Sequence, residues 1–203
     1  AKIYLSNTFN YAQQDRFNLA ILETLKQYIF VFKEKKILNN KKNFGQLSVI
    51  SETFQRCYLS DPKTGEYFLN LINNKEADFT RYTYFYLTYL IENNSIKKAE
   101  EITDNIKFID TTLLLSQGKS WIDNKNSKKL TSVFSCKNHN DVISEFLFLV
   151  SNLYSTQDEI EKSNFYLNLS NFLNSKFIYN LSLTAENHFS NKEYKKAKKT
   201  LKK

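Results

Sequence analysis

Glycine and proline are scarce in this chain: its 203 residues include three glycines and one proline. Turns between β-strands lean heavily on these two residues, so their scarcity argues against a sheet. We expect an all-α fold in which helices are joined by short polar connections. The chain has 24 asparagines, and asparagine tolerates the left-handed conformation that ends many helices. Asparagine is therefore expected to take over the role of glycine at the turns.

Methionine is absent and cysteine occurs twice. Because an open reading frame starts with methionine, we expect the chain to be a segment of a longer protein. Its longest apolar run, YTYFYLTYLI from Tyr82, is about half of the ~20 residues that a membrane helix needs. No membrane span is expected, and the expected compartment is the cytoplasm, or the periplasm if a signal peptide was removed. Cys57 and Cys136 match no metal or redox spacing and are interpreted as small buried side chains.

Positive charge is abundant, but arginine is rare: 26 lysines accompany three arginines, and the net charge is +8. Residues 192–203 carry +6 and residues 33–42 carry +4, whereas the body of the chain is nearly balanced. A lysine run is most often a solvated helix face. The alternative is a basic patch for nucleic acid or another acidic surface, made by Lys192, Lys195, Lys196, Lys198 and Lys199. The shortage of arginine, which makes bidentate phosphate contacts, counts against nucleic acid.

The C-terminal third contains two similar segments at an offset of about 34 residues, a period typical of helical repeats. Residues 154–170 read YSTQDEIEKSNFYLNLS, and residues 188–203 read HFSNKEYKKAKKTLKK, so that Ser163 aligns with Ala197 and Leu167 with Leu201. Residues 142–157 have the apolar period of a helix. Asp158, with Glu161 three residues later, matches a capping box that would start the next helix. Two successive helix pairs are predicted here.

The same spacing of equivalent residues extends towards the N-terminus. Ala99, Leu130, Ser163 and Ala197 occupy equivalent positions whose spacing stays between roughly 31 and about 34 residues, and Ala20 fits an earlier copy. The stretches TFNYAQQDRFNLA, GKSWIDNKNSKKL, SNLYSTQDEIEKS and AENHFSNKEYKKA resemble degenerate tetratricopeptide repeats, whose period is about 34 residues of helix–turn–helix. The chain is similar to bacterial tetratricopeptide proteins of alphaproteobacteria with AT-rich genomes. The resemblance implies an α-solenoid, a right-handed superhelix of stacked antiparallel helix pairs.

The repeats cover residues 80–203 best, and we expect a single domain over residues 1–203. The separation of Ala20 and Ala99 exceeds two repeats by about eleven residues, so an inserted loop or longer helix is predicted around residues 33–43. Residues 44–72 are predicted to form a further helix pair, with Ser60 or Asp61 as the cap and Pro62 in the first turn.

Residues with catalytic chemistry are few. Three isolated glycines cannot form a phosphate-binding loop. His139 and His188 share no metal-ligand spacing with each other or with a cysteine. His139 is close to Cys136, but we favour a loop before a helix over a nucleophile–base pair. The sequence therefore predicts a non-enzymatic protein without a metal or cofactor.

What remains is binding to another protein. In tetratricopeptide proteins the first helix of each pair lines a concave groove, and the resemblance implies that its outward residues contact a peptide or a partner helix. By that frame the strongest candidates are Arg81, Tyr84, Thr88, Lys119, Phe148 and Asn152, followed by Ser155, Ser182, Glu186 and Phe189. The predicted function is a protein-interaction scaffold whose partner is another protein or a further part of its own chain. Nucleic-acid or acidic-surface binding through the basic patch is the alternative.

Overall fold

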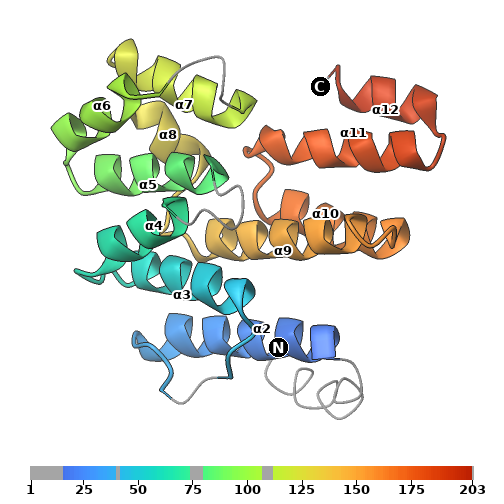
Figure 1. Ribbon diagram of the computed structural model, residues 1–203, viewed down its shortest axis with the longest axis horizontal. Coiled ribbons are helices and arrows are strands. Elements are labelled where there is room, and N and C mark those ends of the chain that lie inside the picture. Colours follow the sequence, from blue (N-terminus) through green and yellow to red (C-terminus); the bar gives the residue numbers. More distant parts are fainter. Residues whose placement is uncertain (1–15, 40–41, 74–79, 107–111, 203) are drawn as a thin grey trace. The chain divides into compact units, whose positions relative to one another are not determined.

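The computed structural model describes residues 16–39, 42–73, 80–106 and 112–202, and all regular secondary structure in these ranges is helical. The all-α prediction is therefore confirmed. The helices, shown in Figure 1, are α2 (Arg16–Glu34), α3 (Gln46–Tyr58), α4 (Thr64–Ile72), α5 (Thr80–Glu92), α6 (Ile96–Asp104), α7 (Leu113–Asp123), α8 (Lys128–Val133), α9 (His139–Ser155), α10 (Ile160–Leu173), α11 (Leu181–Ser190) and α12 (Tyr194–Thr200), with a 3₁₀ turn, η2 (Ile178–Asn180), before α11. Within these ranges, none of the helices combines the length and apolar character that a bilayer crossing requires.

The chain divides into two compact units, unit 1 (residues 1–67) and unit 2 (residues 68–203). In unit 1 the apolar faces of α2 and α3 pack together, with Tyr28 and Phe54 almost fully buried. α2 ends at Glu34 and α3 begins at Gln46, so a long connection lies where the insertion was predicted. The first eight residues of the stretch TFNYAQQDRFNLA, residues 8–15, fall outside the described residues.

Five helix pairs share one kind of turn. The residue in the left-handed conformation is Ser60, Asn94, Lys125, Asp158 or Lys192, with φ between 55° and 61°. In each turn the N–H of the residue after the left-handed one donates to the carbonyl of the residue five positions before that donor, at 2.7–3.0 Å. This is the Schellman motif, which satisfies the free carbonyls at a helix end. Successive left-handed residues are separated by roughly 31 to about 34 residues, the range typical of a two-helix repeat.

These turns correct two details of the sequence prediction. Asp158 is not an N-cap: it is the left-handed residue that ends the turn after α9, and no side chain caps α10. Among these five turns, asparagine takes the left-handed position only at Asn94, while serine, lysine and aspartate take it in the others. The predicted equivalent positions Ala20, Ala99, Leu130, Ser163 and Ala197 are buried, whereas Leu201, which aligns with the buried Leu167, is 72% exposed. Ala99, Leu130 and Ser163 are 0% exposed, and each follows its left-handed residue by five.

Unit 2 has an aromatic core around α5. The apolar run from Tyr82 is buried nearly all round, as expected for a helix without a polar face. Phe85 contacts Phe134 at 4.5 Å and Phe177 at 5.7 Å between ring centroids. α7 approaches α5 closely at Gly118, where a Cβ atom would lie 2.9 Å from a ring carbon of Tyr84.

The seam between α9 and α10 carries two polar layers, which we call the serine–asparagine rungs. In the first rung Ser144 and Ser170 each donate a hydrogen bond to the other's carbonyl, and Asn180 donates to the Ser170 hydroxyl at 3.1 Å. The second rung has a similar pattern seven residues away on each element, with Ser151, Ser163 and Asn187. All six residues are buried, and the small serines let the two helices lie close together.

Candidate functional site

The predicted groove residues on α5 do not face solvent. Tyr84 and Thr88 are 0% exposed, because α6, α7 and α8 pack around α5. The Thr88 hydroxyl donates to the Tyr84 carbonyl at 3.0 Å. Burial raises the pKa of Tyr84, whose hydroxyl makes no hydrogen bond within the described part of the chain. The prediction that these two side chains face an open groove is wrong, and both belong to the core.

Lys119 is also directed inward, since its ammonium group donates to the Thr103 carbonyl at 2.8 Å and lies 3.2 Å from Asp123. Lys119 is buried, so its placement contradicts the predicted outward orientation. Asn152 is exposed and Phe148 is half-buried, as a surface role requires. The predicted set is therefore divided between the interior and the surface.

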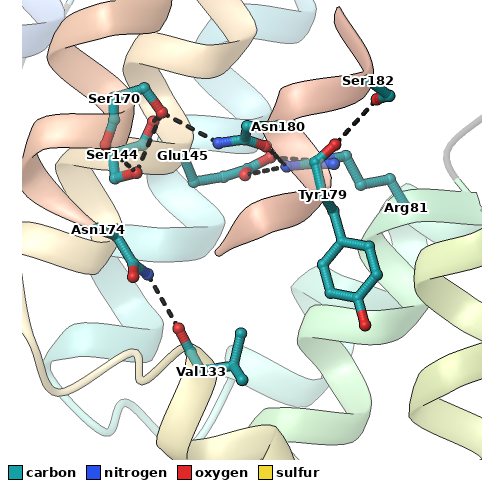
Figure 2. A network of polar contacts seen from close by, with 9 residues as sticks. All are labelled: Arg81, Val133, Ser144, Glu145, Ser170, Asn174, Tyr179, Asn180 and Ser182. Atoms are coloured by element: carbon teal, nitrogen blue, oxygen red, sulfur yellow. Dashed lines mark hydrogen bonds and ion pairs between the residues drawn. The ribbon is translucent and has the colours of Figure 1, made fainter. Parts of the chain in front are cut away.

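Arg81 lies at a junction of α5, α9 and η2, shown in Figure 2. Its guanidinium donates from Nε and Nη2 to the two carboxylate oxygens of Glu145, at 2.8 and 2.7 Å, and from Nη2 to Asn180 at 2.8 Å. It also stacks on Phe148, 4.0 Å from the ring centroid. The Glu145 side chain is 3% exposed. Burial raises the pKa of Glu145, and the Arg81 charge opposes that rise.

Beside Arg81 an apolar cleft of about 460 Å³ opens on unit 2. Three aliphatic side chains on its border are strongly exposed: Leu113 by 77%, Leu201 by 72% and Ile178 by 55%. We call this site the Arg81 cleft; it is lined by Arg81, Thr112, Leu113, Leu114, Ile178, Tyr179, Leu181, Ser182, Thr200 and Leu201. It lies where the start of α7, the start of α11 and the end of α12 come together.

Two hydroxyl groups of the cleft, those of Thr112 and Ser182, are already used in shaping its walls. Thr112 is the N-cap of α7 and accepts a hydrogen bond from the Leu115 N–H at 3.3 Å. Ser182 donates to the Tyr179 carbonyl at 2.9 Å, and Figure 2 shows this contact next to Arg81. The cleft therefore offers mainly apolar surface.

The predicted basic patch is on α12 and the turn before it. Lys192, Lys195, Lys196, Lys198 and Lys199 are all exposed. Lys196 pairs with Glu193 at 2.5 Å, and His188 contacts the other oxygen of Glu193 at 2.7 Å. These hydrogen bonds to Lys196 and His188 lower the pKa of Glu193. Thr200 and Leu201 line the Arg81 cleft, so the C-terminal end of the basic patch, Lys198 and Lys199, lies next to two lining residues in the chain.

The two cysteines supply no free thiol in the part of the chain that the structure describes. Cys57 and Cys136 are buried as predicted, and neither is a free thiol. Cys136 is therefore not available as a nucleophile for His139. No group of three histidine, cysteine, aspartate or glutamate side chains in the described ranges is placed to hold a metal ion.

Of the lining residues, sequence reasoning named only Arg81 and Ser182 as binding residues. The others come from segments far apart in the chain, and a repeat frame does not indicate which helix ends meet. Strong apolar residues at helix ends, such as Leu113 and Leu201, are the signal that could have been noticed. No protein-family model, curated protein or solved structure matches the chain significantly.

Proposed function

We propose that this protein is a non-enzymatic interaction scaffold that binds a segment of another protein, or of a longer form of its own chain. In this proposal its helix pairs form a tetratricopeptide-like right-handed solenoid. The recurrence of the Schellman turn at a nearly constant interval supports a repeat architecture. Small or aliphatic residues buried at equivalent positions support it as well, since a helix pair must bury its apolar face against its neighbours.

The observation that carries the proposal is the exposed apolar border of the Arg81 cleft. Leu113, Ile178 and Leu201 are each more than half exposed around one concave surface. Single exposed apolar side chains are ordinary, but several around one hollow are typical of a binding site. We therefore propose this cleft as the binding surface, which keeps Arg81 of the sequence prediction and leaves out Tyr84, Thr88, Lys119, Phe148 and Asn152.

The alternative is an acidic surface or nucleic acid bound by the basic patch alone. The observation that favours it is the exposure of all five lysines. Lysine acts as a point charge and lacks the planar fork with which arginine grips phosphate. We therefore rank this alternative second.

A peptide selection tests the proposal. A library of random 15-residue peptides is selected on the full chain, and the binders are measured again on a cleft variant, Leu113→Ser with Leu201→Ser. Both side chains are strongly exposed in the free protein, so the variant should fold. We expect the selected peptides to lose at least about tenfold in affinity, because each buried leucine contributes about 1.5–3 kcal/mol.

The matched control is Phe165→Ser with Phe172→Ser, which removes exposed apolar side chains from α10, away from the cleft lining. We expect this variant to bind the peptides as the wild-type chain does. If the control loses affinity and the cleft variant does not, the cleft is not the site. If no peptide is selected, the interaction function itself is contradicted.

A further inference from the structure

We propose that the partner segment in the Arg81 cleft is acidic and amphipathic, with apolar side chains entering the cleft and carboxylates facing the lysines of α12. This inference rests on the function proposed above and specifies the chemistry of the partner. Its basis is the direct continuity between an apolar hollow and a surface of one charge.

That continuity lies at the end of α12, where Leu201 is the C-cap residue. Leu201 lines the cleft, and Lys198 precedes it by three residues. Residues three apart on a helix lie on the same face, with their Cβ atoms about 5–6 Å apart. A ligand that covers the Leu201 side chain therefore comes within reach of the Lys198 ammonium group, and Lys199 follows on the same turn.

Among the residues that the structure describes, the charge of this face is neutralised only in part. Glu193 is the acidic residue of the segment, and it is occupied by Lys196 and His188. Within the described residues, Lys195, Lys198 and Lys199 form no ion pair, and all three are exposed. Acidic side chains of a partner would supply the missing counter-charge and align the segment along α12.

Arg81 contributes to the cleft in a different way. Its charge is balanced by Glu145, with which it makes two hydrogen bonds, and Nη2 also serves Asn180. Nη1 makes no hydrogen bond within the described part of the chain, and Arg81 lines the cleft. Arg81 therefore offers a hydrogen-bond donor at the edge of the apolar surface, while the net positive charge comes from α12.

The shape of the site distinguishes this partner from an anionic membrane. A bilayer is held by apolar side chains that project from a convex surface into the lipid. Here the apolar atoms line a hollow, so the complementary surface must project into the protein. The side chains of a helix or an extended peptide do this, whereas a flat bilayer does not.

Three labelled 16-residue peptides provide the test, and their binding to the full chain is followed by fluorescence anisotropy. The first carries leucine or phenylalanine at a helical spacing of i, i+3, i+4 and i+7 with glutamate elsewhere. The second has lysine in place of each glutamate, and the third has alanine in place of each apolar residue. We expect the acidic amphipathic peptide to bind at least about tenfold more tightly than either of the others.

Lysine variants then test whether Lys198 and Lys199 are the positive charges that bind the acidic peptide. Lys198→Gln with Lys199→Gln should weaken the acidic peptide about threefold to tenfold, because exposed ion pairs contribute modestly. The charge-matched control is Lys128→Gln with Lys129→Gln on α8, where both lysines are exposed and neither lines the cleft. We expect this control to leave the affinity unchanged.

The outcomes separate this inference from the proposed function. If acidic and basic peptides bind equally and both are lost in the Leu113→Ser, Leu201→Ser variant, the scaffold function stands and the acidic partner is wrong. If selected library peptides bind at the cleft while the designed acidic peptide does not, the scaffold function again stands and the acidic partner is again wrong. Binding of the full chain to phosphatidylglycerol vesicles is measured as a further test. If they bind through Leu113 and Leu201 and the acidic peptide does not, the membrane replaces the peptide as the partner.

Discussion

Arg81 shows how one side chain makes a buried charge compatible with the interior of unit 2. Glu145 is almost fully buried, and both of its oxygens accept hydrogen bonds from the guanidinium. Removing one partner of such a pair leaves the other charge uncompensated, which typically costs about 3–5 kcal/mol. The ion pair therefore matters most because its loss would leave the Glu145 carboxylate buried without a counter-charge.

We predict that Arg81→Met lowers the free energy of unfolding of unit 2 by about 3 kcal/mol at pH 7. Burial raises the pKa of Glu145 above its reference value of 4.5, and the loss of Arg81 removes the opposing influence. When folding raises the pKa of an acid, the folded protein is most stable while that acid is protonated. Stability is thus retained below pH 4.5 and lost as the pH rises through the folded-state pKa. In urea unfolding, the difference in unfolding free energy between the wild-type chain and Arg81→Met should be larger at pH 8 than at pH 5.

The double variant Arg81→Met, Glu145→Leu is the control, because it removes both charges and replaces them with apolar side chains. We expect it to recover most of the lost stability and to show no greater dependence on pH than the wild-type chain. A single variant whose deficit is the same at pH 5 and pH 8 would contradict the assignment of a buried charge.

Residue orientation is what the sequence could predict least. The helical period identified α5 as apolar, but Tyr84 and Arg81 lie on a helix whose neighbours were unknown. Tyr84 is in the core although tyrosine is common at interfaces. A helix that is apolar all round gives no indication of an outer face, so the frame taken from the family resemblance decided the prediction and failed there.

The elements and their period were predictable to a much greater extent. Helix pairs were expected at spacings of roughly 31 to about 34 residues, and the left-handed residues from Asn94 to Lys192 have the same spacings. The apolar pattern specifies helices because it is repeated in every turn of each one. The turn chemistry was less predictable, since aspartate at position 158 is compatible with both an N-cap and a left-handed residue.

The Schellman turns give a prediction at the scale of the element. Ser60 has φ 55°, a conformation that costs a residue with a Cβ atom about 1 kcal/mol relative to glycine. We expect Ser60→Gly to raise the free energy of unfolding by about 0.5–1 kcal/mol. Thermal and urea unfolding of the full chain measure the change.

Ser60→Val at the same position is the matched comparison. A β-branched side chain is a poor fit to positive φ, so this variant should be destabilised by at least about 1 kcal/mol. If glycine and valine have the same effect, the turn does not hold Ser60 in the left-handed conformation.

Charge distribution is a property of the whole molecule, and the basic patch is its clearest feature. The net charge of +8 would favour nucleic acid if sign alone decided. An apolar cleft next to the lysines favours a protein segment instead, because the phosphate backbone gains nothing from aliphatic walls. Apolar residues at helix ends could be noticed in the sequence, but not that they meet in one cleft, since its lining comes from four separate segments of the chain.

We predict that single-stranded poly-U binds the full chain with a dissociation constant weaker than about 10 µM at about 150 mM salt. The affinity of cleft-binding peptides should fall less steeply with salt, because apolar contacts supply most of it. Titrations over a tenfold range of salt concentration compare the two ligands. Submicromolar poly-U binding with a slope of about −3.5 in log–log form, as five phosphate contacts would give, would restore nucleic acid as the leading partner.

The two serine–asparagine rungs fix how α9 and α10 are aligned along their length. If α10 slid by one helical turn, Ser163 and Ser170 would leave their partners on α9, and each stranded hydroxyl would cost about 1–3 kcal/mol. A slide of two turns would bring one serine of α10 opposite the wrong serine of α9 and leave the other pair broken. An all-aliphatic seam would tolerate such slippage far better. Pulling this hairpin lengthwise should therefore break it in one abrupt event.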